Sequence, residues 1–327
     1  MTSPSAPVAE PSTLFIPAFW RALSGAERVL VAGAGGGFDV FAALPIYLQL
    51  RALGKTAFLA NLSFSDLAAS DAERLSPSLF RIDHLVGVDR TYFPERHLAG
   101  WLASNGMPGD VYAFDPTGVQ PLRSDYALLV ERLGVDTIVL VDGGTDMLMR
   151  GDEVGLGTPV EDMMSLGAVS GLPVKSFVAC IGFGVDAYHG VCHAHFLENV
   201  AALEAEGAFL GAHTIHLASS VVAQFVAAVE YAHSRMPYRQ SIVNSSIQSA
   251  LEGRFGDVHR SLRTARSTLF INPLMTLYWY FDLGAVARRS LYLSTLEATN
   301  TPAEIEERIA EFRRSLKAVR PKAAIPV

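Results

Sequence analysis

The chain has 327 residues, of which 50% are hydrophobic and 18% are charged, and its formal net charge is −7. This composition is sufficient for a substantial buried core and excludes an intrinsically disordered chain. The sequence has neither basic runs nor arginines interleaved with aromatic residues, so nucleic acid is not an expected partner.

The N-terminal residues and the hydrophobic segments predict a cytoplasmic protein. Residues 1–12 are rich in Ser, Pro and Ala, which predicts a disordered tail, and they lack the basic start and apolar run of a signal peptide. No apolar run reaches 18 residues, so a membrane is not an expected partner, and the most apolar segment, 269–283, is predicted to be a core element. Cys180 and Cys192 are expected to be reduced thiols.

The first predicted elements form a βαβ unit. After a short helix at 13–23, an apolar strand at 28–32 leads into a Gly-rich turn, a helix at 40–53 and a second strand at 56–60. This order predicts two parallel strands joined by a right-handed crossover.

The same alternation of strands and helices continues to residue 218. Thr158-Pro-Val-Glu161 is typical of a capping box with Pro at the first helical position, so a helix is predicted to begin there. Short apolar strands that alternate with amphipathic helices predict an α/β fold with a doubly wound, mostly parallel, Rossmann-like sheet. Further strands are predicted at 82–88, 111–114, 136–141 and 174–181, and further helices at 95–104, 122–133 and 189–206.

The pattern becomes mainly helical in residues 219–327. The last helix is predicted at 301–317, where Thr301-Pro-Ala-Glu304 forms another capping box. No obvious linker separates this portion from the sheet. We therefore expect a single α/β domain over 13–327, with a doubly wound core at 13–218 and a helical C-terminal portion.

Gly-rich loops that carry an aspartate follow three of the predicted strands. Gly36-Gly-Phe-Asp39 and Gly143-Gly-Thr-Asp146 share the pattern Gly-Gly-x-Asp, and Gly182-Phe-Gly-Val-Asp186 is a looser relative. Ligands bind beyond the carboxyl ends of parallel strands, and glycine amides can approach a phosphate or carboxylate closely. The loops therefore predict one shared ligand site at this edge of the sheet.

A simpler interpretation of any one loop is that its glycines form a tight turn and its aspartate caps a helix. Three such loops at one edge favour a site. We expect Asp39, Asp146 and Asp186 to be catalytic, and Asp39 and Asp146 to coordinate a divalent cation, Mg²⁺ rather than Zn²⁺. The residues expected to contact the ligand are Gly35, Gly36, Gly37, Asn61, Asp142, Gly143, Gly144, Thr145 and Arg150.

The segment His189-Gly-Val-Cys-His-Ala-His195 concentrates side chains that can bind metals or move protons. On a helix, His189, Cys192 and His193 would share a face, which leaves a zinc site open. Because no fourth ligand is identifiable, we favour acid/base catalysis by His189 or His193. Arg150 begins a Gly-rich stretch. Two interpretations of this stretch are equally compatible with the sequence, a mobile flap that closes over an anion and an ordinary surface loop.

The first loop matches a dinucleotide-binding fingerprint only in part. Gly33 and Gly35 fit its first two glycines, but Phe38 occupies the third glycine position, and Asn61 follows the second strand where an acid is required. A nicotinamide- or flavin-dependent oxidoreductase is therefore an alternative, as is a non-catalytic metabolite-binding or regulatory protein.

The segment Gly35-Gly-Gly-Phe-Asp-Val40 resembles the pyrophosphate loop Ser-Gly-Gly-x-Asp-Ser of ATP-dependent amide-forming and thiolating enzymes. The two glycines and the aspartate match, and both serines are replaced. This resemblance implies that the glycine amides hold pyrophosphate and that Asp39 acts through Mg²⁺.

Three further motifs resemble a family of bacterial and archaeal proteins of unknown function, and the resemblance covers most of the chain without implying a reaction. They are Ala34-Gly-Gly-Gly-Phe-Asp39, Val141-Asp-Gly-Gly-Thr-Asp146 and Met149-Arg-Gly-Asp-Glu153. From the loops, we expect a small-molecule enzyme, a transferase, hydrolase or ligase, that acts on a phosphorylated or nucleotide-like metabolite. A divalent metal ion and a nucleotide are the expected cofactors, and formation of a homo-oligomer is left open.

Overall fold

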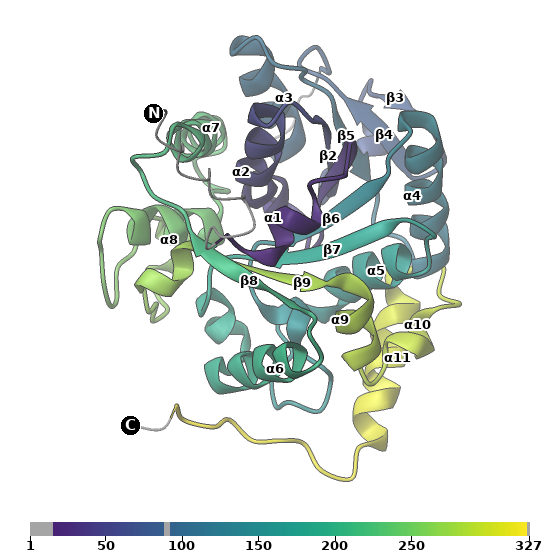
Figure 1. The fold of residues 1–327 in the computed structure, drawn as a ribbon, viewed down its shortest axis with the longest axis vertical. Helices are drawn as coiled ribbons and strands as arrows, with labels where there is room; N and C mark the ends of the chain where they lie inside the picture. Colours follow the sequence, from purple (N-terminus) through teal and green to yellow (C-terminus); the bar gives the residue numbers. More distant parts are fainter. Residues whose placement is uncertain (1–15, 88–91, 326–327) are drawn as a thin grey trace, which may run out of the picture.

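The computed structural model describes residues 16–87 and 92–325, and within them a nine-stranded sheet lies between two layers of helices (Figure 1). The strand order is β3-β4-β5-β2-β1-β6-β7-β9-β8. The tail predicted at 1–12 lies outside the described residues, as does the start of the helix predicted at 13–23. That helix is observed as α1 (Ala18–Ala22).

The centre of the sheet consists of five parallel strands in the order β5-β2-β1-β6-β7. The chain moves outward from β1 through β2 to β5 and then returns to the other side of β1, so the strand order reverses between β1 and β6. This is the predicted doubly wound, Rossmann-like arrangement. These strands are β1 (Arg28–Gly33), β2 (Thr56–Leu62), β5 (Val111–Phe114), β6 (Thr137–Asp142) and β7 (Lys175–Cys180).

The edges of the sheet differ from the sequence-based prediction. The strand predicted at 82–88 is wrong, because β4 (Leu79–Ile82) ends where that strand was expected to begin, and it pairs antiparallel with β5 and with β3 (Glu73–Arg74). The other edge contains β8 (Phe209–Thr214), which was not predicted, and β9 (Leu277–Asp282), which lies antiparallel between β7 and β8. The mainly helical C-terminal portion thus supplies one strand, from the segment predicted to be a core element.

The helices cover the two faces of the sheet in separate layers (Figure 1). Because α2 packs between the sheet and α7, its side chains are buried almost all round. One layer contains α1, α2 (Asp39–Ala52), α3 (Pro94–Ser104), α7 (Ser220–Arg235) and α8 (Ile242–Leu251). The other contains α4 (Val119–Leu133), α5 (Pro159–Ser170), α6 (His193–Ala205), α9 (Leu283–Arg289), α10 (Leu293–Leu296) and α11 (Pro302–Ser315).

The two predicted capping boxes have different outcomes. At α11, the Thr301 hydroxyl accepts a hydrogen bond from the Glu304 amide, as predicted. At α5 the helix begins at Pro159 as predicted, but Thr158 makes no cap, because its hydroxyl donates to Asp146 at 3.0 Å. A residue that the sequence assigned to a helix end therefore belongs to a long-range contact.

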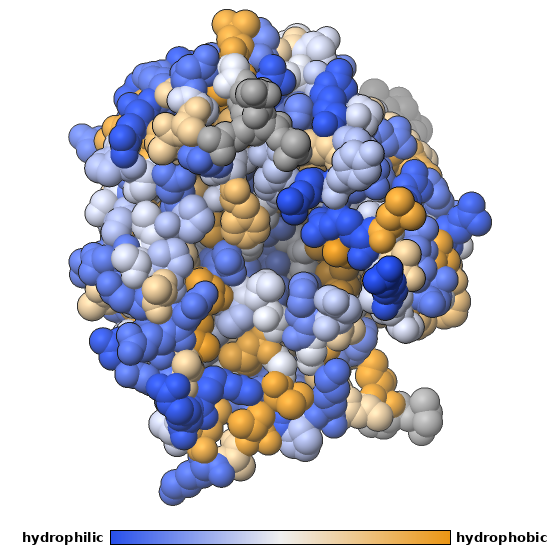
Figure 2. All heavy atoms as spheres, turned by 180° about the vertical axis from the view of Figure 1, so that it is seen from behind, coloured by the Kyte–Doolittle hydropathy of each residue, from blue (hydrophilic) through white to orange (hydrophobic). Residues whose placement is uncertain are grey.

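The surface is mainly hydrophilic on the face seen from behind. Figure 2 shows separate hydrophobic patches on that face and a hollow near its middle. Among the described residues, none of the helices has the length and apolar character needed to cross a membrane.

Candidate functional site

The first two Gly-Gly-x-Asp loops lie side by side where the strand order of the sheet reverses. Gly33 and Val141 are partners at the ends of β1 and β6, and the Ala34 amide donates to the Val141 carbonyl at 2.9 Å. In open α/β sheets, ligands bind in the crevice at this reversal point. The geometry therefore places both loops where a ligand is expected.

The first loop depends on backbone conformations that favour glycine. Gly36 and Gly37 have φ values of 90° and 60°, which lie in the left-handed region. Asp39 is the first residue of α2, and its Oδ2 accepts a hydrogen bond from the Gly35 amide at 2.8 Å. Burial raises the pKa of Asp39 to about 7, although hydrogen bonds from the Gly143 and Gly35 amides act in the opposite direction.

A buried polar pair supports this loop from behind. Asn61, which the sequence predicted to contact the ligand, is fully buried and donates to the Gly37 carbonyl at 2.8 Å and to Glu95 Oε1 at 2.6 Å. The structure thus places Asn61 against the loop backbone. Burial raises the pKa of Glu95 to about 7. Sequence analysis did not single out Glu95, because an acid in the first turn of a predicted helix has the common role of favouring that helix end.

In the second loop, glycine is required by close approach. A Cβ atom on Gly143 would lie 2.5 Å from Asp39 Oδ1, and one on Gly144 would lie 2.8 Å from Asp186 Oδ2. Asp146 begins a 3-10 turn (Asp146–Leu148), and its Oδ2 accepts hydrogen bonds from the Thr158 amide at 2.7 Å and hydroxyl at 3.0 Å. The glycines allow carboxylates from other loops to approach this backbone.

The third loop meets the second through Thr145. Asp186 lies in a 3-10 turn (Val185–His189), and its Oδ2 accepts hydrogen bonds from the Thr145 amide at 2.7 Å and hydroxyl at 3.4 Å. The structure therefore brings all three loops together, and Asp39, Asp142, Asp146 and Asp186 are all buried there.

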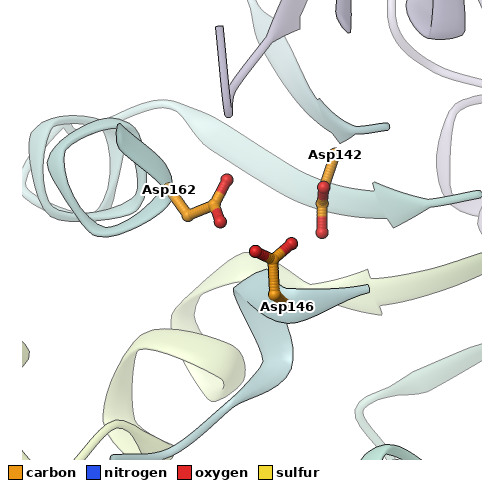
Figure 3. A group of neighbouring side chains, drawn as sticks. All are labelled: Asp142, Asp146 and Asp162. Carbon is orange, nitrogen blue, oxygen red and sulfur yellow. The ribbon is translucent and has the colours of Figure 1, made fainter. Parts of the chain in front are cut away.

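Asp162 on α5 completes this cluster and was missed by sequence analysis. Its side chain is fully buried, and neither of its carboxylate oxygens has a hydrogen-bond partner. Carboxylate oxygens of Asp142, Asp146 and Asp162 lie within 4.8 Å of one another, and the three side chains point toward a common space (Figure 3). One signal was available, because Asp162 shares a helical face with the apolar residues Leu166 and Val169.

Five buried aspartates, hereafter the acidic centre, lie together at this edge of the sheet. None of the ion pairs among residues 16–87 and 92–325 includes any of them. Burial is the main cause that raises each pKa. Repulsion between the carboxylates adds to it for four of the aspartates, whereas at Asp146 hydrogen bonds from Thr158 and the charge of His189 act in the opposite direction. Buried charges need a partner, so this arrangement suits a cation, and all-oxygen donors suit Mg²⁺, Mn²⁺ or Ca²⁺ better than Zn²⁺. The acidic centre consists of Asp39, Asp142, Asp146, Asp162 and Asp186.

The histidine segment does not form the predicted helical face. His189 ends the 3-10 turn, and Gly190, with a φ of 92°, separates it from α6, which begins at His193. The Cys192 thiol donates to the Ala323 carbonyl at 3.1 Å, and the His193 ring packs against Phe183 at 5.1 Å between centroids. The prediction that His189, Cys192 and His193 share a face is therefore wrong, because a glycine in the left-handed region ends the preceding turn.

Arg150 lies in a loop that the C-terminal segment holds in place. Its side chain pairs with Asp152 at 3.5 Å, and its amide donates to the buried Glu153. Arg320 pairs with both of these acids at 3.0 Å. These contacts favour the surface-loop interpretation over a mobile flap.

A cleft with a volume of about 490 Å³ opens beside the acidic centre. Its lining includes the first loop, with Gly36 and Asp39, and also Arg239, Arg263 and the first residues of α8. A second cavity of about 300 Å³ contains Asp186 and shares His189, Ile242, Val243 and Arg263 with the first. Residues of the first and third loops thus line two adjoining cavities that share His189.

The class defined by these features is an α/β protein with a Rossmann-like sheet, and a candidate site lies at the point where its strand order reverses. Residues 81–314 match the family described as protein of unknown function (DUF1152), and the chain belongs to this family. This confirms the family resemblance, although the first glycine motif precedes the matched residues. Comparison with curated proteins and with solved structures gave no match.

Proposed function

We propose that this protein is a metal-dependent enzyme that transfers, hydrolyses or joins groups on a phosphorylated or nucleotide-like metabolite. The observation that carries the proposal is the acidic centre at the reversal point, and within it Asp162, whose buried carboxylate has no hydrogen-bond partner. A buried, unpartnered carboxylate is costly unless a cation or a proton compensates it.

The residues that would hold the metal are Asp142, Asp146 and Asp162, whose oxygens already lie within 4.8 Å of one another. Hard carboxylate oxygens are the donors that Mg²⁺ and Mn²⁺ prefer. A bound divalent ion would polarise a phosphoryl oxygen and offset the negative charge that otherwise repels phosphate.

The remaining roles belong to the loops around the cleft. Gly36 and Gly37 line the cleft together with Asp39 and Phe64, and the Gly37 amide already donates to the Leu62 carbonyl at 3.1 Å. His189 lines both cavities beside Asp186, where it can accept or donate a proton. In this proposal the first loop forms one side of the ligand cleft and His189 moves a proton.

The place of Asn61 favours this proposal over a dinucleotide-dependent oxidoreductase. Dinucleotide sites use an acid at the end of the second strand to bind the ribose. Here that position holds a fully buried Asn61, whose amide group already donates to Gly37 and Glu95.

Metal titration of the chelator-treated full chain tests the proposal. By calorimetry, we expect the wild type to bind Mn²⁺ and Mg²⁺, and Asp162→Asn to lower the Mn²⁺ affinity roughly 100-fold while retaining the fold, since the amide keeps the shape of the carboxylate. Asp282→Asn is the control, because its Oδ1 only caps α9 through Ala285. A wild type that binds neither ion would contradict the proposal.

Turnover is tested separately with phosphorus NMR on nucleotides and sugar phosphates in the presence of Mg²⁺. We expect metal-dependent conversion of at least one compound, and its loss in Asp162→Asn. A protein that binds such a compound with metal but converts none would instead be the non-catalytic binding protein left open by the sequence.

A further inference from the structure

Two arginines line the cleft together with the first loop, and we infer that Arg239 and Arg263 bind the phosphate group of the ligand that reaches the acidic centre. This inference rests on the proposed function and deepens it, because it assigns the residues that select a phosphorylated compound. Arg263 lines both cavities, and Arg239 lines the larger one.

Neither cleft arginine is neutralised by an acid within the described residues. Arg81, Arg123 and Arg320 each pair with at least one carboxylate. In contrast, neither Arg239 nor Arg263 forms an ion pair with a carboxylate in the part of the chain that the structure describes. Two positive charges without carboxylate partners in one cleft, in a protein with a net charge of −7, favour an anionic ligand there.

A backbone carbonyl fixes the position of the Arg263 guanidinium group and occupies only part of its N–H donors. Arg263 Nη1 donates to the Gln240 carbonyl at 2.7 Å. A guanidinium group has five N–H donors in a planar fork, so this bond orients Arg263 and leaves donors for a phosphate. Because a neutral backbone carbonyl rather than an acid holds Arg263, its positive charge remains available to the ligand.

Tyr92 lies near both the first loop and the two arginines. Its half-buried side chain lines the cleft, and desolvation raises the pKa of its hydroxyl. The charges of Glu95 and Asp39 raise that pKa further, whereas those of Arg263 and Arg239 lower it. The hydroxyl therefore lies within electrostatic reach of both the acidic centre and the arginines. Asp39 and both arginines line the same cleft.

The start of α8 adds to the positive character of the same cleft. Ser241, Ile242 and Val243 line the cleft at the beginning of this ten-residue helix, where backbone dipoles favour negative charge. The Asn244 side chain donates to the Phe38 carbonyl at 3.3 Å, which ties this helix end to the first loop. The helix and the first loop are thus held at a defined separation.

A bound metal ion and the two arginines together would offset the negative charge of the acidic centre. Phosphate would be repelled by five buried carboxylates, but a divalent ion among them and two guanidinium groups in the cleft make its binding favourable. The expected ligand is therefore a metal-bound phosphate ester or anhydride, with its phosphate oxygens between the two.

Binding of inorganic pyrophosphate with Mg²⁺ in excess tests this inference in the full chain. By calorimetry, we expect the wild type to bind magnesium pyrophosphate, Arg239→Gln and Arg263→Gln each to lower the affinity roughly 10-fold, and the double variant roughly 100-fold, with a weaker salt dependence. Arg266→Gln is the matched control, since this exposed arginine follows closely in the chain and does not line either cavity. Mn²⁺ affinity without pyrophosphate should stay unchanged in all three single variants.

Each contrary result has a distinct meaning. Arginine variants that bind magnesium pyrophosphate like the wild type would overturn the inference and leave the metal centre intact. A wild type that binds Mn²⁺ but not magnesium pyrophosphate would overturn it as well. If the arginine variants lose Mn²⁺ affinity too, their role is structural, and the inference fails. Failure of the wild type to bind any divalent ion would instead contradict the proposed function.

Discussion

The loops 36–39 and 143–146 have the same sequence pattern but use their glycines in different ways. In the first loop, Gly36 and Gly37 adopt positive φ values. In the second, neither glycine has a positive φ, and a Cβ atom would instead collide with the carboxylates of Asp39 and Asp186. Glycine is needed in the first loop for its backbone conformation, and in the second loop for the space that nearby carboxylates occupy.

The two aspartates differ in the same sense. Asp39 accepts backbone hydrogen bonds from Gly35 and Gly143. One carboxylate oxygen of Asp146 accepts hydrogen bonds from both the amide and the hydroxyl of Thr158. The carboxylate of Asp146 points toward Asp142 and Asp162 (Figure 3). A shared motif therefore does not imply a shared role, because Asp39 is held by backbone amides, whereas Asp146 faces two other carboxylates.

Gly144→Ala should have the largest effect, because it tests the close approach in the second loop. The added Cβ atom would lie 2.8 Å from Asp186 Oδ2 and 3.0 Å from Asp142 Oδ1 and must displace both. We expect the Mn²⁺ affinity to fall at least roughly 100-fold, measured by calorimetry. Gly25→Ala is the control, since nothing lies within 4 Å of its Cβ position. Unchanged Mn²⁺ affinity in Gly144→Ala would show that the close approach does not matter.

Glu95→Gln tests the buried support of the first loop through pH. The folded protein raises the pKa of Glu95 from 4.5 to about 7, so it binds the proton more tightly than the unfolded chain does. Its contribution to stability is therefore full below pH 4.5 and is lost as the pH rises to 7. Glutamine does not titrate. The free energy of unfolding of the variant, relative to that of the wild type, should therefore rise over this window by roughly 3 kcal/mol, at about 1.4 kcal/mol per pKa unit.

The measurement for Glu95→Gln is urea denaturation of both proteins from pH 4 to pH 8. Burial lowers the pKa values of His97 and His233 to about 4, which makes stability rise with pH. Both proteins contain these histidines, so their contribution cancels in the difference between the two free energies of unfolding. A difference that stays constant with pH would contradict the raised pKa of Glu95.

Asp39→Asn and Asp146→Asn form a matched pair that separates scaffold from centre. An asparagine at 39 has one acceptor oxygen for the amides of Gly35 and Gly143, so one amide loses its partner, and the free energy of unfolding should fall by about 1–3 kcal/mol. An asparagine at 146 can still accept from Thr158 through its single oxygen, so stability should hold while Mn²⁺ affinity falls. Identical behaviour of the two variants would erase the distinction between the loops.

The parallel strands and their loops could be predicted from the sequence because they are local patterns. Strands buried on both faces give continuous apolar runs, as in β1 and β6, and the glycines mark where these strands end. The carboxyl ends of parallel strands share one edge, which is why the three loops could be expected to meet.

Other features depend on tertiary contacts that no local pattern contains. The edge strand β8 is only half-buried and contains Gly211, so it has neither an apolar run nor a clean alternation. Asp162 directly follows the acid of an apparent capping box, and its burial arises from the packing of α5 on the second loop. Arg239 and Arg263 reach the cleft only because of the way in which the chain around α8 folds back onto the first loop.

Gly37→Ala should have the smallest effect and tests whether the first loop is a scaffold. Gly37 has a φ of 60°, and an alanine there pays the strain of the left-handed region, about 1–2 kcal/mol. Its Cβ atom would also lie 2.6 Å from the Tyr92 hydroxyl, the far end of a side chain that can turn away. Gly54→Ala is the matched control, because Gly54 has a φ of 78° but nothing within 4 Å of its Cβ position. Urea denaturation should therefore give a similar loss for both variants, and Mn²⁺ affinity should equal that of the wild type. A large loss of Mn²⁺ affinity in Gly37→Ala alone would mean that the first loop holds the metal directly.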